Sequence, residues 1–230
     1  MAISFASLST PLASTTNQST AYTGTAATAS AGDILISFVS VSGNTTAGTM
    51  SGGSLTWSLV TSGAKNTNAD LCLIYWAYVS SSVSVTPSYT PSAAATGCII
   101  SVVRVIGSTG KSSSLNLVQT AATATGATAN PTISFTSATN TNSGILLFAA
   151  NGTNSTTQWT APTGFTELSE VAFNTPTNSG EAAYRTSGGT LTTYTWTNAN
   201  TTSWRTFGLE FAAAQATTFD PMGMLGFFGI

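Results

Sequence analysis

The sequence predicts an all-β protein, and three observations support this fold class. The chain of 230 residues is 42% hydrophobic and 10% aromatic, which is enough apolar surface for a core, whereas disordered chains are poor in aromatic residues and rich in charge. Threonine and serine supply most of its uncharged polar residues, and threonine suits the exposed face of a strand better than a helix. No window shows an apolar stripe of helical period with capping residues. We therefore expect an antiparallel β-sandwich, jelly-roll-like in architecture.

Ten apolar runs are predicted to be strands, because turn signals of glycine, proline and serine separate them. In the first half they span residues 31–43, 53–63, 69–79, 84–92 and 97–107. In the second half they span residues 142–152, 162–172, 180–189, 192–200 and 204–214. The alternation of Phe207, Leu209 and Phe211 with polar or small residues is typical of a half-buried strand, and it predicts that Glu210 faces solvent. The polar stretches 9–31 and 119–130 are expected to form edge strands, with flexible loops as the alternative.

The two sets of five runs match in order and spacing, which predicts an internal duplication. The matched residues are Gly32 with Gly144, Trp57 with Phe165, Tyr75 with Tyr184, Tyr89 with Trp196, and Val105 with Phe211. We expect a first β-sandwich repeat at 1–110, a second at 111–214 and an apolar C-terminal segment at 215–230. Two tandem sandwiches are the first expectation. One larger sandwich, with one half per sheet or with the halves interleaved, is the alternative.

Ionisable side chains are scarce, and this argues against catalysis. The chain has five lysines and arginines, seven aspartates and glutamates, and no histidine, so triads that need histidine are impossible. A glycosidase needs two carboxylates on one site, whereas Glu167 and Glu170 are expected to point to opposite faces of a strand. The few scattered basic residues do not suit nucleic acid, which is bound through several phosphate contacts. We expect no enzyme activity, no cofactor and no metal site.

Cys72 and Cys98 each lie in an apolar run. Two buried thiols are the first expectation, and a disulfide between neighbouring strands is the alternative. The first residues lack the basic and apolar regions of a secretory signal. No stretch reaches the length of a membrane helix, so we expect neither export by the general pathway nor a membrane partner.

Two features are candidate contact sites. Trp159 has no counterpart in the first half, which makes it the best candidate for an exposed aromatic contact with a glycan, although a packed loop tryptophan is the first expectation. The C-terminal segment, residues 215–230, is strongly apolar, and its glycines disfavour a helix. An exposed segment of this kind must be covered by something, either by the chain's own body or by a neighbouring subunit. Its candidate docking residues are Phe219, Met222, Met224, Leu225, Phe227, Phe228 and Ile230.

The run Gly-Asp-Ile-Leu-Ile-Ser-Phe at 32–38, followed by Thr-Trp-Ser-Leu-Val at 56–60 and Leu-Cys-Leu-Ile-Tyr-Trp at 71–76, resembles a module of tailed-phage virion proteins. The resemblance covers residues 32–106 and again 144–212, including Pro-Thr-Gly-Phe-Thr-Glu-Leu at 162–168. That family includes capsid decoration (cement) proteins, head fibres and tail-associated proteins. The resemblance implies a structural β-sandwich, displayed as a symmetric oligomer, with no catalytic residues.

These observations together predict a phage virion structural protein, namely a capsid decoration or cement protein that stabilises the shell through inter-subunit contacts. Its expected partners are itself, as a homo-oligomer with a trimer favoured, and a major capsid or other virion protein. Its expected location is the capsid or tail surface of the virion, after assembly in the host cytoplasm. The alternative is a receptor- or glycan-binding adhesin domain of a fibre or cell-surface protein.

Overall fold

The computed structural model describes residues 2–65, 70–108, 114–152, 159–173, 177–198 and 203–214. Within these ranges the regular structure is entirely strand, and every strand pair is antiparallel. The predicted all-β antiparallel fold is therefore confirmed. The described part of the chain contains no helix long and apolar enough to cross a bilayer.

The first half builds one main sheet in the order β1-β11-β5-β8-β7, with β2 also paired to β11. Its strands are β1 (Ser4–Ser7), β2 (Leu12–Ser14), β5 (Ile34–Ser42), β7 (Ser58–Ala64), β8 (Leu71–Tyr78) and β11 (Gly97–Ile106). Shorter strands form two small sheets beside it, β3-β10-β6 and β4-β9. These are β3 (Tyr22–Thr23), β4 (Ala27–Ala29), β6 (Thr49–Ser51), β9 (Val83–Val85) and β10 (Ser88–Thr90).

The second half builds another main sheet in the order β12-β20-β14-β17-β16. Its strands are β12 (Ala122–Gly126), β14 (Ser143–Asn151), β16 (Thr166–Phe173), β17 (Asn178–Arg185) and β20 (Trp204–Ala212). Two small pairs accompany this sheet, β13 (Thr132–Ser134) with β18 (Thr193–Thr195) and β15 (Trp159–Thr160) with β19 (Thr197–Asn198). All ten apolar runs thus contain strands, and part of the 119–130 stretch is the edge strand β12, as predicted.

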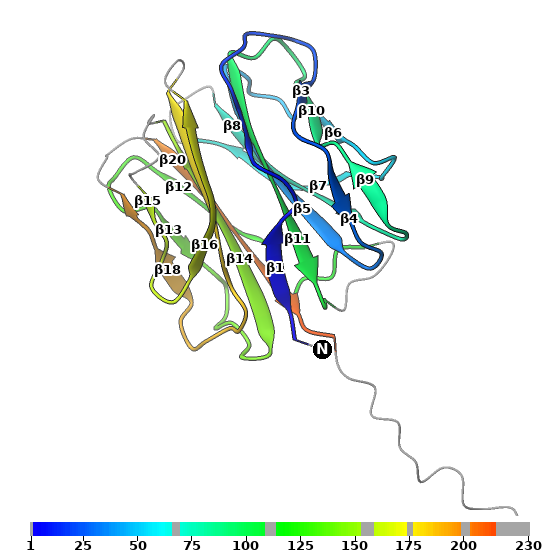
Figure 1. Cartoon of the computed structure of the whole chain (residues 1–230). Coiled ribbons are helices and arrows are strands. Elements are labelled where there is room, and N and C mark those ends of the chain that lie inside the picture. The colour runs from blue at the N-terminus through cyan, green and yellow to red at the C-terminus, as the bar shows by residue number, and fades with distance from the viewer. Residues whose placement is uncertain are drawn as a thin grey trace, which may run out of the picture.

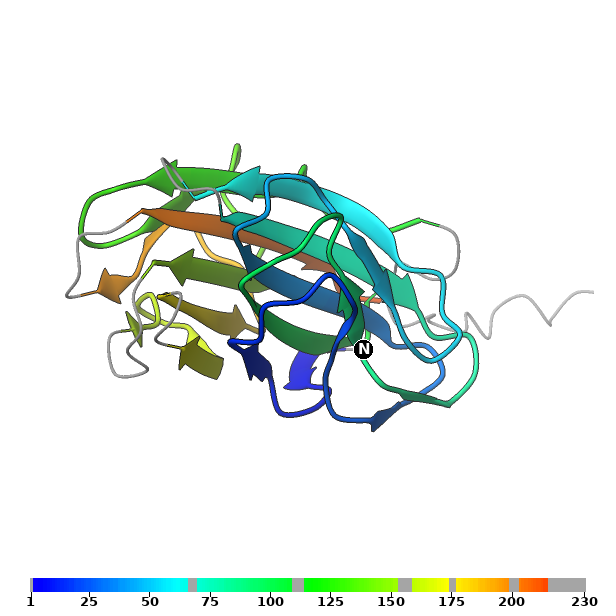
Figure 2. The same ribbon diagram turned by 90° about the horizontal axis from the view of Figure 1, so that it is seen from above.

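The sheets are stacked in layers (Figures 1 and 2). The two main sheets face each other across a central core, and the small sheets cover their outer faces. Strands β5 and β14 are therefore buried along their whole length. This double covering explains why apolar residues occur on both faces of each strand, as in Ile34–Leu35 and Ile145–Leu146, because neither face of either strand meets solvent.

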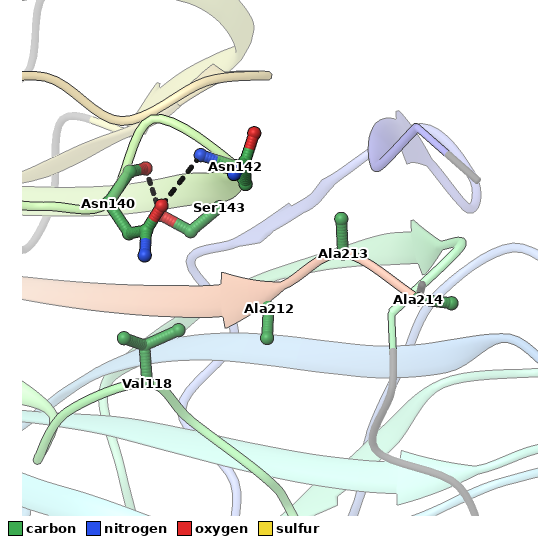
Figure 3. A pocket seen from close by; sticks show the side chains of 7 residues that line it. All are labelled: Val118, Asn140, Asn142, Ser143, Ala212, Ala213 and Ala214. Carbon is green, nitrogen blue, oxygen red and sulfur yellow. Dashed lines mark hydrogen bonds between the residues drawn. The ribbon is translucent and has the colours of Figure 1, made fainter. Parts of the chain in front are cut away.

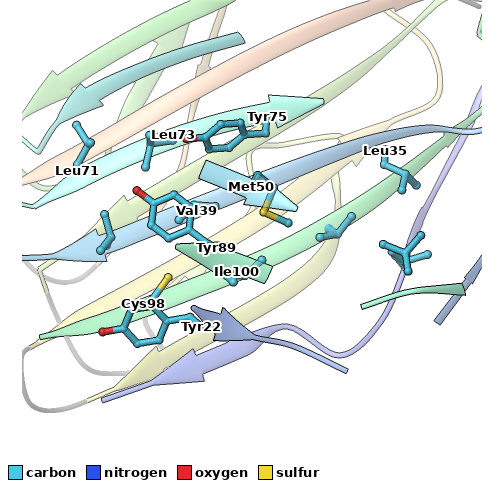
Figure 4. Packing of buried hydrophobic residues seen from close by; sticks show 14 of the residues in the cluster. Tyr22, Leu35, Val39, Met50, Leu71, Leu73, Tyr75, Tyr89, Cys98 and Ile100 are labelled. Carbon is cyan, nitrogen blue, oxygen red and sulfur yellow. The ribbon is translucent and has the colours of Figure 1, made fainter. Parts of the chain in front are cut away.

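The outer core of the first half lies between its main sheet and its small sheets (Figure 4). Tyr22, Tyr75 and Tyr89 are buried in it, and their hydroxyl groups are satisfied by the backbone. The Tyr22 hydroxyl donates to the Ala95 carbonyl at 2.9 Å, and the Tyr75 hydroxyl donates to the Gly48 carbonyl at 2.8 Å. The Tyr89 hydroxyl accepts from the Gly48 amide at 3.0 Å. Burial raises the pKa of Tyr89 to about 12, so these rings are structural, neutral groups.

The central core joins the two halves through aromatic contacts. Phe38 from β5 stacks on Phe148 from β14 with ring centroids 5.2 Å apart. Second-half glycines make room for first-half side chains: a Cβ at Gly144 would lie 2.6 Å from the Ile3 side chain, and one at Gly180 would lie 3.1 Å from Phe38. Each half thus contributes one sheet to a shared core in addition to its own outer core. The arrangement combines features of the tandem and the single-sandwich expectations.

The matched positions of the two halves agree only in part. Tyr89 and Trp196 are both fully buried in outer cores, and β7 and β16 carry a bulge at a similar place. However, Tyr75 faces an outer core whereas Tyr184 packs on the central core. Gly32 lies in a turn whereas Gly144 lies in a strand. The two main sheets share a strand order, but duplication and jelly-roll connectivity stay predictions.

Candidate functional site

The two ends of the described chain lie side by side at one end of the molecule, which we call the base (Figure 1). Strand β1 pairs with the end of β11, and Ala213 forms a bridge to Ser108, just beyond β11. The Ala214 amide donates to the Gly107 carbonyl at 2.8 Å. The C-terminal segment therefore begins at a fixed point of the base, directly after Ala214.

Two grooves border Ala213, next to this exit point. One, of about 360 Å³, is shown in Figure 3 and is lined by Val118, Asn140, Asn142, Ser143, Ala212, Ala213 and Ala214. The other, of about 280 Å³, is lined by Ala2, Ile3, Thr141, Asn142, Thr186 and Ala213. Val118, at the first groove, is 44% exposed. The base thus offers small apolar surfaces mixed with amide and hydroxyl groups.

Glu210 closes the turn beneath the first groove. Contrary to the sequence prediction it is fully buried, because the outer face of β20 is covered by a second layer instead of solvent. Its carboxylate accepts from the Asn140 amide at 2.6 Å, from the Ser143 hydroxyl and from the Gln119 side chain. In the first half Asp33 caps the equivalent turn and pairs with Arg104 at 2.7 Å. These carboxylates are structural.

The seven predicted docking residues, Phe219, Met222, Met224, Leu225, Phe227, Phe228 and Ile230, lie outside the described residues. What the structure does describe is the surface around the start of their segment. The interpretation of residues 215–230 as a docking element therefore stays a prediction, and it is taken up below.

The expectation that Glu167 and Glu170 point to opposite faces is wrong. A bulge between Glu167 and Ser169 shifts the register of β16, so that Glu167 pairs with Ala183 and Glu170 pairs with Glu181. Residues 181 and 183 of β17 are two apart and share a face, which brings Glu167, Glu170 and Glu181 together on the outer face of the sheet. A bulge adds one residue to a strand. Every side chain beyond it then points to the face opposite to the one that regular alternation would give it.

Glu181 is the fully buried carboxyl of this group. It is 1% exposed, and neither of its oxygens has a hydrogen-bond partner of normal geometry among the described residues. Burial, reinforced by the negative charges of Glu167 and Glu170, raises its pKa to about 8; the neighbouring Trp196 indole offsets part of this rise. Glu181 is therefore largely protonated at neutral pH. No group of three or more cysteine, aspartate or glutamate side chains suited to a metal ion occurs in the described ranges.

Trp159 does not present an exposed ring. It is 5% exposed, and its indole N–H donates to the Ser179 hydroxyl at 3.0 Å. The first expectation, a packed tryptophan, is therefore confirmed. Sequence reasoning missed Trp76, which lines a groove on the first main sheet. The feature of the sequence that could have indicated this groove is the spacing of two residues between Trp76 and Tyr78, which places both rings on one face of β8.

Cys72 and Cys98 are free, buried thiols. Cys72 faces the central core and Cys98 faces the outer core of the first half, so the thickness of one sheet separates them and a disulfide is excluded. Burial raises the pKa of both thiols, which keeps them in the unreactive protonated form.

A buried polar cluster crosses the central core. Lys65 is fully buried, and its ammonium group donates to Asn178 Oδ1 at 2.7 Å and lies 3.6 Å from Asp70. The Asn178 amide also donates to the hydroxyls of Ser40 and Ser42 in the first half. Because Lys65 belongs to the first half and Asn178 to the second, the cluster fixes the relative position of the main sheets.

Replacing Asn178 with alanine is expected to lower the free energy of unfolding by about 2 kcal/mol, because it removes an acceptor from a buried ammonium group. Urea unfolding followed by tryptophan fluorescence measures this loss. Asn116→Ala, at an exposed asparagine, is the matched control and should change stability by less than about 0.5 kcal/mol. Equal stability of the two variants would contradict a structural role for the cluster.

No family model, no curated protein and no solved structure matches the chain. Its function must therefore be inferred from its residues and their geometry.

Proposed function

We propose that the protein is a structural component of a tailed-phage virion, specifically a capsid decoration or cement protein. The observation that carries this proposal is the base of the molecule, where the described chain leads through Ala212–Ala214 into a strongly apolar segment, 215–230. The layered sheets supply a rigid body, and the segment supplies a means of attachment. The resemblance of residues 32–106 and 144–212 to virion modules supports the same role.

In this role, the burial of apolar surface drives attachment of the protein to the capsid. The apolar side chains of residues 215–230 bind a neighbouring copy or a major capsid protein, and the grooves beside Ala213 provide amide and hydroxyl groups for the same contact. Each attached copy bridges neighbouring shell subunits, and binding to the assembled state stabilises it by mass action. A body with few charges suits such packing, since charged groups oppose close association.

The environments of three buried acidic side chains are compatible with this structural role. Asp33 and Glu210 close turns, and Glu181 is buried beside the Trp196 indole. Each therefore has a structural environment. The proposal accordingly includes no catalytic residue and no cofactor.

Removing residues 215–230 is expected to convert a homo-oligomer, with a trimer as the favoured form, to a monomer and to abolish binding to particles of the major capsid protein. The mass of the full chain and of the 1–214 variant in solution, measured by sedimentation, tests the first outcome. Co-sedimentation with capsid particles tests the second.

A full-length variant provides the matched comparison. Phe227→Ser combined with Phe228→Ser keeps the chain length but removes two large apolar side chains, and it should weaken association as the truncation does. Leu191→Ala, at a leucine that is 59% exposed on the body, should leave association unchanged. A full-length chain that stays monomeric and does not bind capsid particles would contradict the proposal.

A further inference from the structure

A groove of about 510 Å³ lies on the first main sheet, and it shares no lining residue with the grooves of the base. Its size is within the range of small-ligand sites. It is lined by Ser54, Leu55, Thr56, Ser58, Trp76, Tyr78 and Ser80. These residues come from β7, from β8 and from the connections that flank them. The groove therefore rests on a rigid sheet and is bordered by two loops.

Trp76 and Tyr78 form the aromatic floor of this groove. They alternate along β8, so both rings lie on the face that carries Ile34 and Ile36 on the adjacent strand β5. Both rings are partly buried against the central core, which fixes their orientation. Ser58 lies directly opposite Trp76 on the edge strand β7 and is exposed. The groove is thus a fixed aromatic surface that is open at the sheet edge.

The remaining lining is neutral and rich in hydroxyl groups. Ser54, Thr56, Ser58 and Ser80 are all exposed, and the lining residues in the described part of the chain carry no charge. No hydrogen bond within the described ranges engages the Trp76 indole N–H or the Tyr78 hydroxyl. The groove lining therefore combines an indole ring, a phenol ring and several aliphatic hydroxyls.

We propose that this groove binds a neutral oligosaccharide. The apolar face of a pyranose ring would pack on the Trp76 and Tyr78 rings, and the sugar hydroxyls would exchange hydrogen bonds with the indole, the phenol and the surrounding hydroxyls. The uncharged lining disfavours phosphorylated, sulfated or uronic-acid ligands, which would lose hydration without gaining a cationic partner. The inference does not depend on the proposed virion role, because it uses no residue of the base or of residues 215–230.

The test is titration of the full-length protein with three neutral hexasaccharides, maltohexaose, cellohexaose and hexa-N-acetylchitohexaose, at up to millimolar concentration. Binding is followed by the indole N–H signals in two-dimensional NMR spectra. We expect at least one hexasaccharide to shift the Trp76 signal saturably, with the buried Trp159 and Trp196 signals unchanged. No saturable shift with any of the three, or a shift only with an alginate hexasaccharide as the acidic comparison, would overturn the proposal.

Two variants assign the binding to the groove. Trp76→Ala should weaken association about tenfold or more, since an aromatic contact is lost. Because Trp76 also packs on the core, Ser58→Glu provides a second variant at an exposed position; it places a charge beside the ring and should weaken binding to a similar extent while the protein stays folded. Leu191→Ala, on the other half, should bind as the parent does. Undiminished binding by Ser58→Glu would place the site elsewhere and overturn the proposal.

Discussion

Replacing Phe148 with alanine is expected to destabilise both halves of the molecule together, by about 4 kcal/mol. Phe148 belongs to the second half and is fully buried, and its ring stacks on Phe38 of the first half. Its removal leaves a cavity in the core that the two main sheets share. Since the sheets pack on each other along this core, loosening one sheet removes the covering of the other.

Urea unfolding combined with hydrogen exchange measures this effect. We expect a single transition whose midpoint falls for Phe148→Ala, with exchange protection lost to the same extent in β5 and in β14. Leu191→Ala, which removes an exposed side chain of the second half, should shift the midpoint little. If β14 lost protection while β5 kept it, the halves would be independent domains, and the shared core would contribute little to stability.

The strands were predictable from the sequence because local patterns determine them. Short apolar runs bounded by glycine, proline and serine turns located strands at all ten predicted positions, whereas β1 (Ser4–Ser7), which belongs to the first main sheet, was not predicted. What covers each face is a different question. It depends on contacts between residues far apart in sequence, such as Phe38 with Phe148, and period-2 alternation contains no information about them.

The incorrect predictions share this origin. Glu210 was placed in solvent because it alternates with Phe207, Leu209 and Phe211, but the second face of β20 is covered by another layer and a turn that the carboxylate caps. Glu167 and Glu170 were placed on opposite faces because a regular strand was assumed, whereas a bulge between them restores a common face. A single inserted residue of this kind leaves no clear mark in a sequence.

The aromatic candidates show the same limit. Trp159 lacked a counterpart in the first half and was therefore taken as a candidate for an exposed ring, yet a second-half serine, Ser179, accepts its N–H inside the outer core. Trp76 lay in an apolar run and resembled a core residue. Only the position of β8, next to the edge strand β7, leaves part of its ring beside a groove.

The stability of the protein is expected to fall as pH rises from about 4.5 to about 8, because Glu181 holds its proton in the folded state. Its pKa is raised from 4.5 to about 8 on folding, so between these values the native state binds a proton that the unfolded state has released. The contribution of the protonated Glu181 to the free energy of unfolding is therefore fully present below about pH 4.5. It decreases by about 1.4 kcal/mol per pH unit across this window. Above pH 8 both states are ionised and this contribution no longer changes.

Glu181→Gln isolates this contribution, because glutamine has the shape of the protonated acid and does not ionise. Urea unfolding of parent and variant at a series of pH values should give similar stabilities near pH 4 and a more stable variant near pH 8. Glu167→Gln, which removes an exposed charge that raises the pKa of Glu181, should leave the slope unchanged and lower the upper end of the pH window only slightly. Parallel pH profiles for the parent and Glu181→Gln would mean that Glu181 is ionised in the native state. The two carboxylate oxygens of Glu181 would then need hydrogen bonds from buried water molecules. The outer core of the second half would therefore contain water.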